Sequence, residues 1–385
     1  MSKHIILIPG IQGTKLHTVN EKDFVKVWSG IKKYYVNIHQ LELQDDGLHD
    51  KGAETLIERA DVEDLAYSEI INYLRSLGYR VYIFGYDWRK SNIVSGQELV
   101  SFVKNLSNKL NNSKFIFLTH SMGALVLSAF FRLLPEAEIR KYLHRAIMTV
   151  PPFLGSVEAF FNLYIGRSML FNLSDDIRKV IRSFPSIYEL VSVYDGVMEF
   201  EDGKERDILD FDQSWQHYKN PDKESTIRKN RMMRKKINQL KALRSEGNKL
   251  IYDFGKLDDE IRKKLLVLLG TGEETREKIY VREKSPDGNL VNFFDFEHFP
   301  LTQGDGTVHI KSASVFARDI TTIAVESFGW ETRLNSHLFM KDWHSFFLNN
   351  GRVQNIIKRF IASDDPAKLS SKWYRSVLSY GIHQI

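Results

Sequence analysis

The feature that most constrains the fold of this chain is a strand-like run that leads into a serine and then at once into a helix. Phe115–His120 is rich in apolar and aromatic residues, Ser121-Met122-Gly123 follows, and helical periodicity starts at the glycine. This arrangement is called a nucleophile elbow. Its turn holds the serine in a strained backbone conformation, so that the hydroxyl stands clear of the main chain. The pattern therefore predicts that Ser121 lies at the carboxyl end of a buried strand.

The rest of the chain supports an α/β fold around that strand. Continuous apolar runs, expected for strands buried on both faces of a parallel sheet, occur at residues 4–9, 80–85, 114–120, 144–151, 278–282 and 321–327. Segments with helical periodicity lie between them, at residues 64–77, 97–110 and 123–134. Strands that alternate with helices are typical of a mostly parallel sheet covered by helices.

Composition excludes several classes of protein. Among the 385 residues, 43% are hydrophobic and 27% charged, which are the proportions of a folded globular protein and not of a disordered or collagen-like chain. The chain has no cysteine, so a disulfide, a thiolate nucleophile and a cysteine-ligated metal are excluded. The net charge of +5 is too small to indicate a nucleic-acid partner. The apolar run at residues 5–9 is too short for a signal peptide, and we expect a cytoplasmic protein.

The middle of the chain differs from both ends. Between residues 165 and 277 the strand signal fades and charge rises, which predicts a cap inserted between core segments 1–164 and 278–385, the first of which carries an excursion at 17–60. Six of the nine residues at 228–236 are Lys or Arg, within a predicted helix at 227–243. This basic run is interpreted either as a solvated helix face or as a surface that contacts anionic lipid.

A serine hydroxyl needs a base, and that base needs a carboxylate to orient it. In chains with a nucleophile elbow the partners follow in the order acid, then histidine. Asp305 lies between two glycines and is the predicted acid, and His337 beyond the last strand is the predicted base. His344 is the alternative base, but it lies in a segment that resembles the start of a helix and suits packing. The predicted catalytic residues are therefore Ser121, Asp305 and His337.

The oxyanion formed on attack needs backbone N–H donors that are already in place. Met122, directly after the serine, is the first predicted donor. The second is Ile11 or, as the alternative, Gln12, because both lie in a glycine-containing loop after the first strand. His120 and Gly123 are predicted to support the elbow.

Several segments resemble the lecithin:cholesterol acyltransferase-like family, which includes lysosomal phospholipase A. In family order over residues 6–340, the matching segments are Ile6-Leu7-Ile8-Pro9-Gly10-x-x-Gly13 with Leu16, Gly85-Tyr86-Asp87-Trp88-Arg89, His120-Ser121-Met122-Gly123, Pro152-Phe153-Leu154-Gly155-Ser156, residues 183–190, Gly304-Asp305-Gly306-Thr307-Val308 and His337-x-x-Met340. The resemblance implies an α/β-hydrolase fold with an inserted, mainly helical cap. It also implies acyl transfer from a lipid ester through a serine-bound intermediate. Thr119 departs from the family, which usually has glycine there.

The residues and the resemblance together predict a serine hydrolase, a lipase or phospholipase, that cleaves carboxylic esters of lipids. An acyltransferase that passes the acyl group to an alcohol would use the same residues, and a catalytically silent lipid-binding protein is the alternative of another class. No metal ligand spacing or phosphate-binding loop indicates a cofactor. The expected partners are a lipid or acyl-ester substrate and an anionic membrane surface, but not nucleic acid. The aromatic and basic residues of Phe24–Trp28, Ile31, Tyr34 and Tyr35 either contact lipid or pack against the core.

Overall fold

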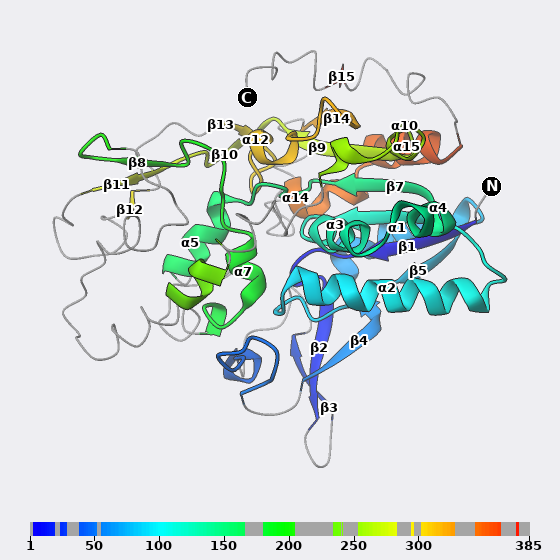
Figure 1. Ribbon diagram of the computed structural model, residues 1–385, viewed down its shortest axis with the longest axis horizontal. Helices are drawn as coiled ribbons and strands as arrows, with labels where there is room; N and C mark the ends of the chain where they lie inside the picture. Colours follow the sequence, from blue (N-terminus) through cyan, green and yellow to red (C-terminus); the bar gives the residue numbers. More distant parts are fainter. Residues whose placement is uncertain are drawn as a thin grey trace.

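The structure of the protein is a computed structural model (Figure 1). It describes residues 3–19, 24–28, 38–51, 55–165, 180–204, 234–239, 241, 253–282, 294–295, 302–327, 343–362 and 375–376. Within these ranges, no helix is both long and apolar enough to cross a membrane.

A seven-stranded sheet forms the centre of the molecule. Its strands, in spatial order, are β15 (Arg375–Ser376), β14 (Thr321–Glu326), β9 (Leu265–Thr271), β7 (Leu143–Thr149), β6 (Phe115–His120), β1 (His4–Ile8) and β5 (Arg80–Ile83). All neighbours pair in parallel except β14 and β15, which are antiparallel. The inner strands are buried on both faces, as their continuous apolar runs predict.

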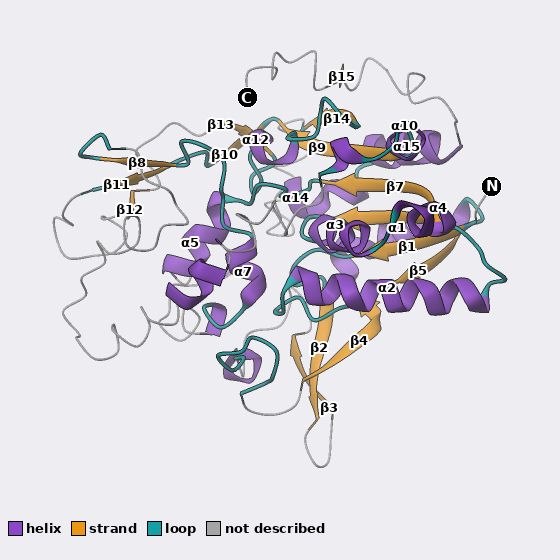
Figure 2. Cartoon of the chain, viewed as in Figure 1, coloured by secondary structure: helices purple, strands orange, loops and turns teal. Residues whose placement is uncertain are grey.

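Helices cover both faces of this sheet (Figure 2). Alternate residues of each strand point to opposite faces, so that Ile5 and Leu7 join the helices of one face while Ile6 and Ile8 join those of the other. The first face is covered by α1 (Asp64–Ser76) and α15 (Gly351–Ala362), and the second by α2 (Asn92–Lys109) and α3 (Gly123–Leu133). The three predicted helices are confirmed. The second begins five residues earlier than predicted, where Ser91 caps it by accepting a hydrogen bond from Ile93 N.

Three smaller sheets and several short helices complete the described fold. An antiparallel sheet of β2 (Thr14–Val19), β3 (Phe24–Trp28) and β4 (Thr55–Val62) extends away from the core (Figure 1). The other two sheets pair β10 (Glu273–Thr275) with β13 (Thr302–Gly304), and β11 (Ile279–Val281) with β8 (Met198–Phe200) and β12 (Phe294–Asp295). The short helices are η1 (Ile38–Leu41), α4 (Glu136–Tyr142), α5 (Val157–Ile165), α7 (Pro185–Glu189), η2 (Phe254–Lys256), α10 (Asp259–Arg262), α12 (Ile310–Ala313), α14 (Trp343–Phe346) and η3 (Phe347–Asn349).

Two predictions about the core strands are wrong. The predicted cap at 165–277 contains β9, which lies between β7 and β14 in the main sheet, so the core resumes before residue 278. The run at 278–282 forms β11, which belongs to a small sheet and not to the main one. The seven residues of β9 are all buried, as a strand in the middle of a sheet requires. The other predicted core strands are confirmed. Together, the parallel sheet, the covering helices and the elbow described below make this an α/β-hydrolase fold.

Candidate active site

Ser121 lies in the predicted strained turn between β6 and α3. Its φ is +52°, in the left-handed region that side chains rarely adopt, and its amide donates to Thr149 O at 2.9 Å. Gly123 begins α3 against the end of β1, where a Cβ would approach Ile8 O to 2.4 Å. The elbow is confirmed, together with the need for glycine. Thr119 is a buried residue of β6, a position that suits a β-branched side chain.

His344 joins Ser121 to Asp305. Its Nε2 lies 2.8 Å from Ser121 Oγ, and its Nδ1 lies 2.7 Å from Asp305 Oδ2. Because a carboxylate only accepts hydrogen bonds, Nδ1 carries the proton that it donates to Asp305, and Nε2 accepts from the serine hydroxyl. All three side chains are buried at the carboxyl edge of the sheet.

The prediction that His337 is the base and that His344 serves packing is therefore corrected. The position between the serine and the acid is taken by His344, at the start of α14, while His337 lies outside the described residues. The backbone of the same residue is also fixed, since His344 N donates to Asp305 O at 3.1 Å. Trp343 packs against Gly270 of β9, where a Cβ would come within 2.8 Å of the indole nitrogen. Trp343 thus anchors the histidine that follows it. This packing is what the sequence indicated for the segment.

Backbone amides fix the carboxylate of Asp305. Its Oδ1 accepts from Thr307 N at 2.9 Å and from Val308 N at 2.6 Å, which leaves Oδ2 for His344. The N–H of Gly306 donates to Thr275 Oγ1 at 2.9 Å, so the turn is also held from β10. This geometry places Asp305 next to His344, and the catalytic role of Asp305 stays a prediction.

His309 closes the same loop as a neutral group. Its Nδ1 accepts from Lys311 N and caps α12, and its Nε2 lies 2.8 Å from Thr302 Oγ1. Burial lowers the pKa of His309 to about 4, although the nearby carboxylate of Glu277 acts in the opposite direction. The loop that carries Asp305 is called the acid loop below. Because the His309 imidazole is uncharged at neutral pH, this position holds no positive charge that would compete for the carboxylate of Asp305.

The loop after β1 lies directly against the serine. Residues 10–13 form a turn closed by a bond from Gly13 N to Gly10 O at 3.0 Å, with Gln12 at φ +62°. A Cβ on Gly10 would come within 2.9 Å of Ser121 Cβ. Ile11 and Gln12 line the cavity that contains Ser121, as the predicted oxyanion donors must. Their roles as donors, and that of Met122 N, stay predictions.

The cavity beside Ser121 has a volume of about 870 Å³, with the open solvent at its mouth included. Its lining includes both large apolar side chains and polar ones, the latter from α5, from the residue before α5 and from the loop that carries Asp305. The apolar group is Trp88, Ile181, Phe184, Ile187 and Leu190, and the polar group is Ser156, Glu158, Asn162 and Thr307. The sequence did not point to the α5 residues, because two polar positions in an apolar helix carry no recognisable motif. Within the described ranges, no group of three or more His, Asp or Glu side chains is arranged to hold a metal ion.

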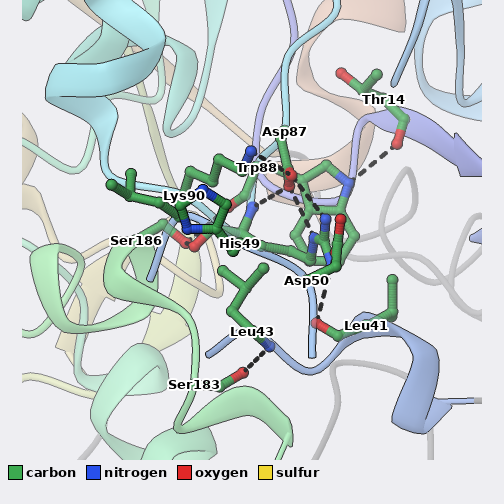
Figure 3. Close-up of polar contacts among 12 residues, drawn as sticks. Thr14, Leu41, Leu43, His49, Asp50, Asp87, Trp88, Lys90, Ser183 and Ser186 are labelled. Atoms are coloured by element: carbon green, nitrogen blue, oxygen red, sulfur yellow. Dashed lines mark hydrogen bonds and ion pairs between the residues drawn. The ribbon is translucent and has the colours of Figure 1, made fainter. Parts of the chain in front are cut away.

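Asp87-Trp88-Arg89 forms a buried corner beside the cavity. Arg89 donates to both carboxylate oxygens of Asp87, at 2.9 and 2.7 Å, and to Asp50 at 2.7 Å. The indole of Trp88 donates to Thr14 O at 3.0 Å (Figure 3). The corner therefore connects the 38–51 segment to the loop that faces Ser121.

Sequence comparisons identify known proteins that are similar to this chain. The family model described as lecithin:cholesterol acyltransferase matches residues 36–338. Phospholipase A(1) LCAT3 of Arabidopsis thaliana is 26% identical over 234 residues, which are 49% of this chain and 52% of that protein, so the chain spans about half the length of this relative.

Solved structures show the same fold. A chain in the crystal structure of the Tle4-Tli4 complex has a TM-score of 0.58 at 15% identity, over 94% of this chain and 99% of that one. The lipase BlEst2 of Bacillus licheniformis has a TM-score of 0.42 at 13% identity, over 92% and 91% of the two chains, and this weaker likeness carries no argument. Since the family model spans well over half of the 385 residues, the chain belongs to the lecithin:cholesterol acyltransferase family.

Proposed function

We propose that this protein is a serine hydrolase that cleaves acyl esters of lipids. The observation that carries the proposal is the hydrogen-bonded series Ser121–His344–Asp305 beside a cavity with a large apolar wall. The family and the phospholipase name of the Arabidopsis relative support a lipid ester as the substrate.

The geometry suits transfer through an acyl-enzyme. Ser121 Oγ attacks the ester carbonyl carbon while His344 Nε2 takes its proton, and Asp305 stabilises the imidazolium. The amides of Met122 and of Ile11 or Gln12 bind the oxyanion. His344 then returns the proton to the leaving alcohol oxygen, and the acyl group stays on Ser121. In the second half of the reaction His344 deprotonates a water molecule, which attacks the acyl carbon and releases the fatty acid and a free serine.

The test is labelling with a fluorophosphonate, combined with hydrolysis of a short, water-soluble ester. Ser121→Ala should abolish both, because it removes the hydroxyl that lies 2.8 Å from His344 Nε2. Ser101→Ala removes an exposed serine of α2 and should leave both readouts unchanged. Labelling of the Ser121→Ala protein at the stoichiometry of the wild type would refute the proposal.

An acyltransferase is the second candidate, and the acyltransferase for which the family is named favours it. Water and an alcohol compete for the same acyl-enzyme, so the two activities share Ser121, His344 and Asp305. Product analysis with and without a long-chain alcohol separates them. A new ester in the presence of the alcohol, at the expense of free fatty acid, supports transfer. A catalytically silent lipid-binding protein would not need His344 and Asp305 within hydrogen-bond distance of the serine and of each other.

Contact with an anionic membrane is a further part of the proposal. Arg234 and Lys235 are exposed on a helical segment at 234–239, whereas residues 228–233 lie outside the described residues. Lys236 does not belong to this surface, because it is only 4% exposed and its burial lowers its pKa. Binding to anionic vesicles should weaken with salt and should fall when the other five basic residues at 228–235 are changed to Gln. Equal binding to neutral vesicles would count against this contact. The lipid contact of Phe24–Trp28 and the cytoplasmic location stay predictions.

A further inference from the structure

A second series of buried hydrogen bonds lies behind Ser121 and takes no part in the proton transfer. The amide of Gly10 donates to the Tyr67 hydroxyl at 2.9 Å. The same hydroxyl lies 2.9 Å from His120 Nδ1, and His120 Nε2 lies 2.9 Å from His344 O. Tyr67 belongs to α1 and is 2% exposed, and the sequence singled it out in no motif.

The direction of each bond in this series is fixed by chemistry. A carbonyl oxygen only accepts, so His120 Nε2 carries the proton that it donates to His344 O. The Tyr67 oxygen accepts from Gly10 N, which leaves the one proton of the hydroxyl for His120 Nδ1, so that Tyr67 is the donor and Nδ1 the acceptor. Burial raises the pKa of Tyr67 well above its usual range, which keeps the phenol protonated for this bond. The series therefore runs in one direction, from the Gly10 amide to the His344 carbonyl.

The two ends of the series are the two parts of the site that must stay aligned with Ser121. Gly10 begins the turn that presents Ile11 and Gln12, and His344 carries the base. The rings of His120 and His344 are 5.3 Å apart, and the Tyr67 ring meets His120 edge to face at 5.6 Å. The turn at residues 10–13 is called the oxyanion loop here. The Tyr67 hydroxyl thus connects this loop to His120 and, through His120, to His344.

We propose that Tyr67 is a positioning residue, which holds the oxyanion loop directly through Gly10 and the base segment through His120, in register around Ser121. The proposal rests on the function proposed above. Tyr67 does not itself line the cavity, and its hydroxyl bonds to Gly10 and His120, which do line it, rather than to Ser121. Its effect should therefore fall on the geometry of the transition state more than on substrate binding. Small displacements of catalytic groups are costly, because reacting atoms must be aligned to within a fraction of an ångström.

The test compares Tyr67→Phe with Tyr188→Phe. Both variants remove one buried phenol hydroxyl, and that of Tyr188 donates to Arg182 O at 2.9 Å in the α7 region. Activity is measured as kcat per active site, counted by fluorophosphonate titration, so that unfolded molecules do not contribute. Tyr67→Phe should lower kcat roughly 10- to 100-fold with KM within about twofold, as expected for lost alignment. Tyr188→Phe should leave kcat within about twofold, although both variants lower the melting temperature.

A double-mutant cycle with His120→Gln completes the test. If Tyr67 holds the base segment through His120, the double variant should be no slower than the slower single variant, to within about twofold. Losses that multiply would show that the two residues act independently and would overturn the proposal. So would a Tyr67→Phe kcat equal to that of Tyr188→Phe. The function proposed above would survive either outcome, since it depends on Ser121 labelling and on the loss of hydrolysis in Ser121→Ala.

Discussion

The elbow and the acid loop hold their catalytic groups in different ways. At the elbow, Ser121 is held by close contact between main chains, and Gly123 leaves no room for a side chain against Ile8 O. In the acid loop, Asp305 is held by directed hydrogen bonds from backbone amides, and Thr275 and His309 hold the turn around it. Steric contact is sensitive to volume, whereas hydrogen bonds are sensitive to polarity and protonation. The two regions should therefore fail under different perturbations.

The largest expected effect is at His344, which joins the two regions. His344→Ala should lower kcat by roughly 10³-fold or more, the scale of losing the base of such a triad. His337→Ala should change kcat far less. Steady-state kinetics on a soluble ester, with melting temperatures to confirm folding, would check this. An equal loss in both variants, with folding intact, would show that the base assignment from the structure is incomplete.

The steric character of the elbow predicts the next largest effect. Gly123→Ala should lower the free energy of unfolding by about 3 kcal/mol, because the new Cβ would meet Ile8 O at 2.4 Å and Pro9 O at 2.6 Å. Gly351→Ala is the control, since a Cβ there meets no atom within 4 Å and alanine favours the helix. Urea unfolding of both variants gives the comparison. Equal stabilities would mean that the elbow is not held by close contact.

The polar character of the acid loop predicts a pH effect. The pKa of His309 is about 4 in the fold and near 6.5 in the unfolded chain, so between these values the unfolded chain binds a proton that the folded chain does not. Stability should therefore fall as the pH falls. The wild type should lose about 2 kcal/mol more than His309→Asn between pH 7 and pH 5, since asparagine keeps a cap but does not titrate there.

Urea unfolding at the two pH values checks this difference. Glu277 faces His309 at 3.8 Å and Lys311 lies beside it, but the pKa of Glu277 is lowered, chiefly by its bond to Lys311 against the effect of burial. Its contribution is therefore lost only below its ordinary pKa near 4.5, outside the window tested. Parallel pH profiles of wild type and His309→Asn would contradict the prediction.

The smallest expected effect is at Thr275. Thr275→Val leaves the amide of Gly306 without its acceptor, which should cost about 1 kcal/mol and lower kcat about fivefold if the cost falls on the acid loop. Thr322→Val is the control, because Thr322 is a buried threonine of β14 whose hydroxyl bonds to Ile320 O. Equal kcat values, measured per titrated site, would show that the bond from β10 does not position Asp305.

The same contrast explains how much of the site the sequence could predict. The elbow is local, since strand, serine and helix follow within about twenty residues, and its elements and strain were predicted correctly. The choice between His337 and His344 was not local. It depends on where the chain places α14 after β14, and on Trp343 meeting Gly270 of β9. Spacing along the sequence contains no information on that contact.

One error and one omission of the sequence analysis have related causes. The apolar run of Leu265–Thr271 was present in the sequence, but the charged residues around it suggested a cap instead of a core strand. Tyr67 lay on the buried side of a correctly predicted helix, and the helical pattern alone could not show that its hydroxyl meets Gly10 and His120. Such contacts join residues 53 to 57 positions apart, and only the assembled sheet brings them together.

The bond between Ser121 and His344 spans 223 positions of the chain. A chain that is being synthesised therefore completes the elbow long before His344 is made. If His344 activates Ser121 as proposed, we expect the serine to stay a poor nucleophile until β9 and β14 have joined the sheet. Contacts of such long range form late in folding, because the intervening chain must first be ordered. The fraction of chains whose Ser121 reacts with a phosphonate should therefore equal the fraction in which the central sheet is assembled. Measured over time, this fraction would follow the last steps of folding.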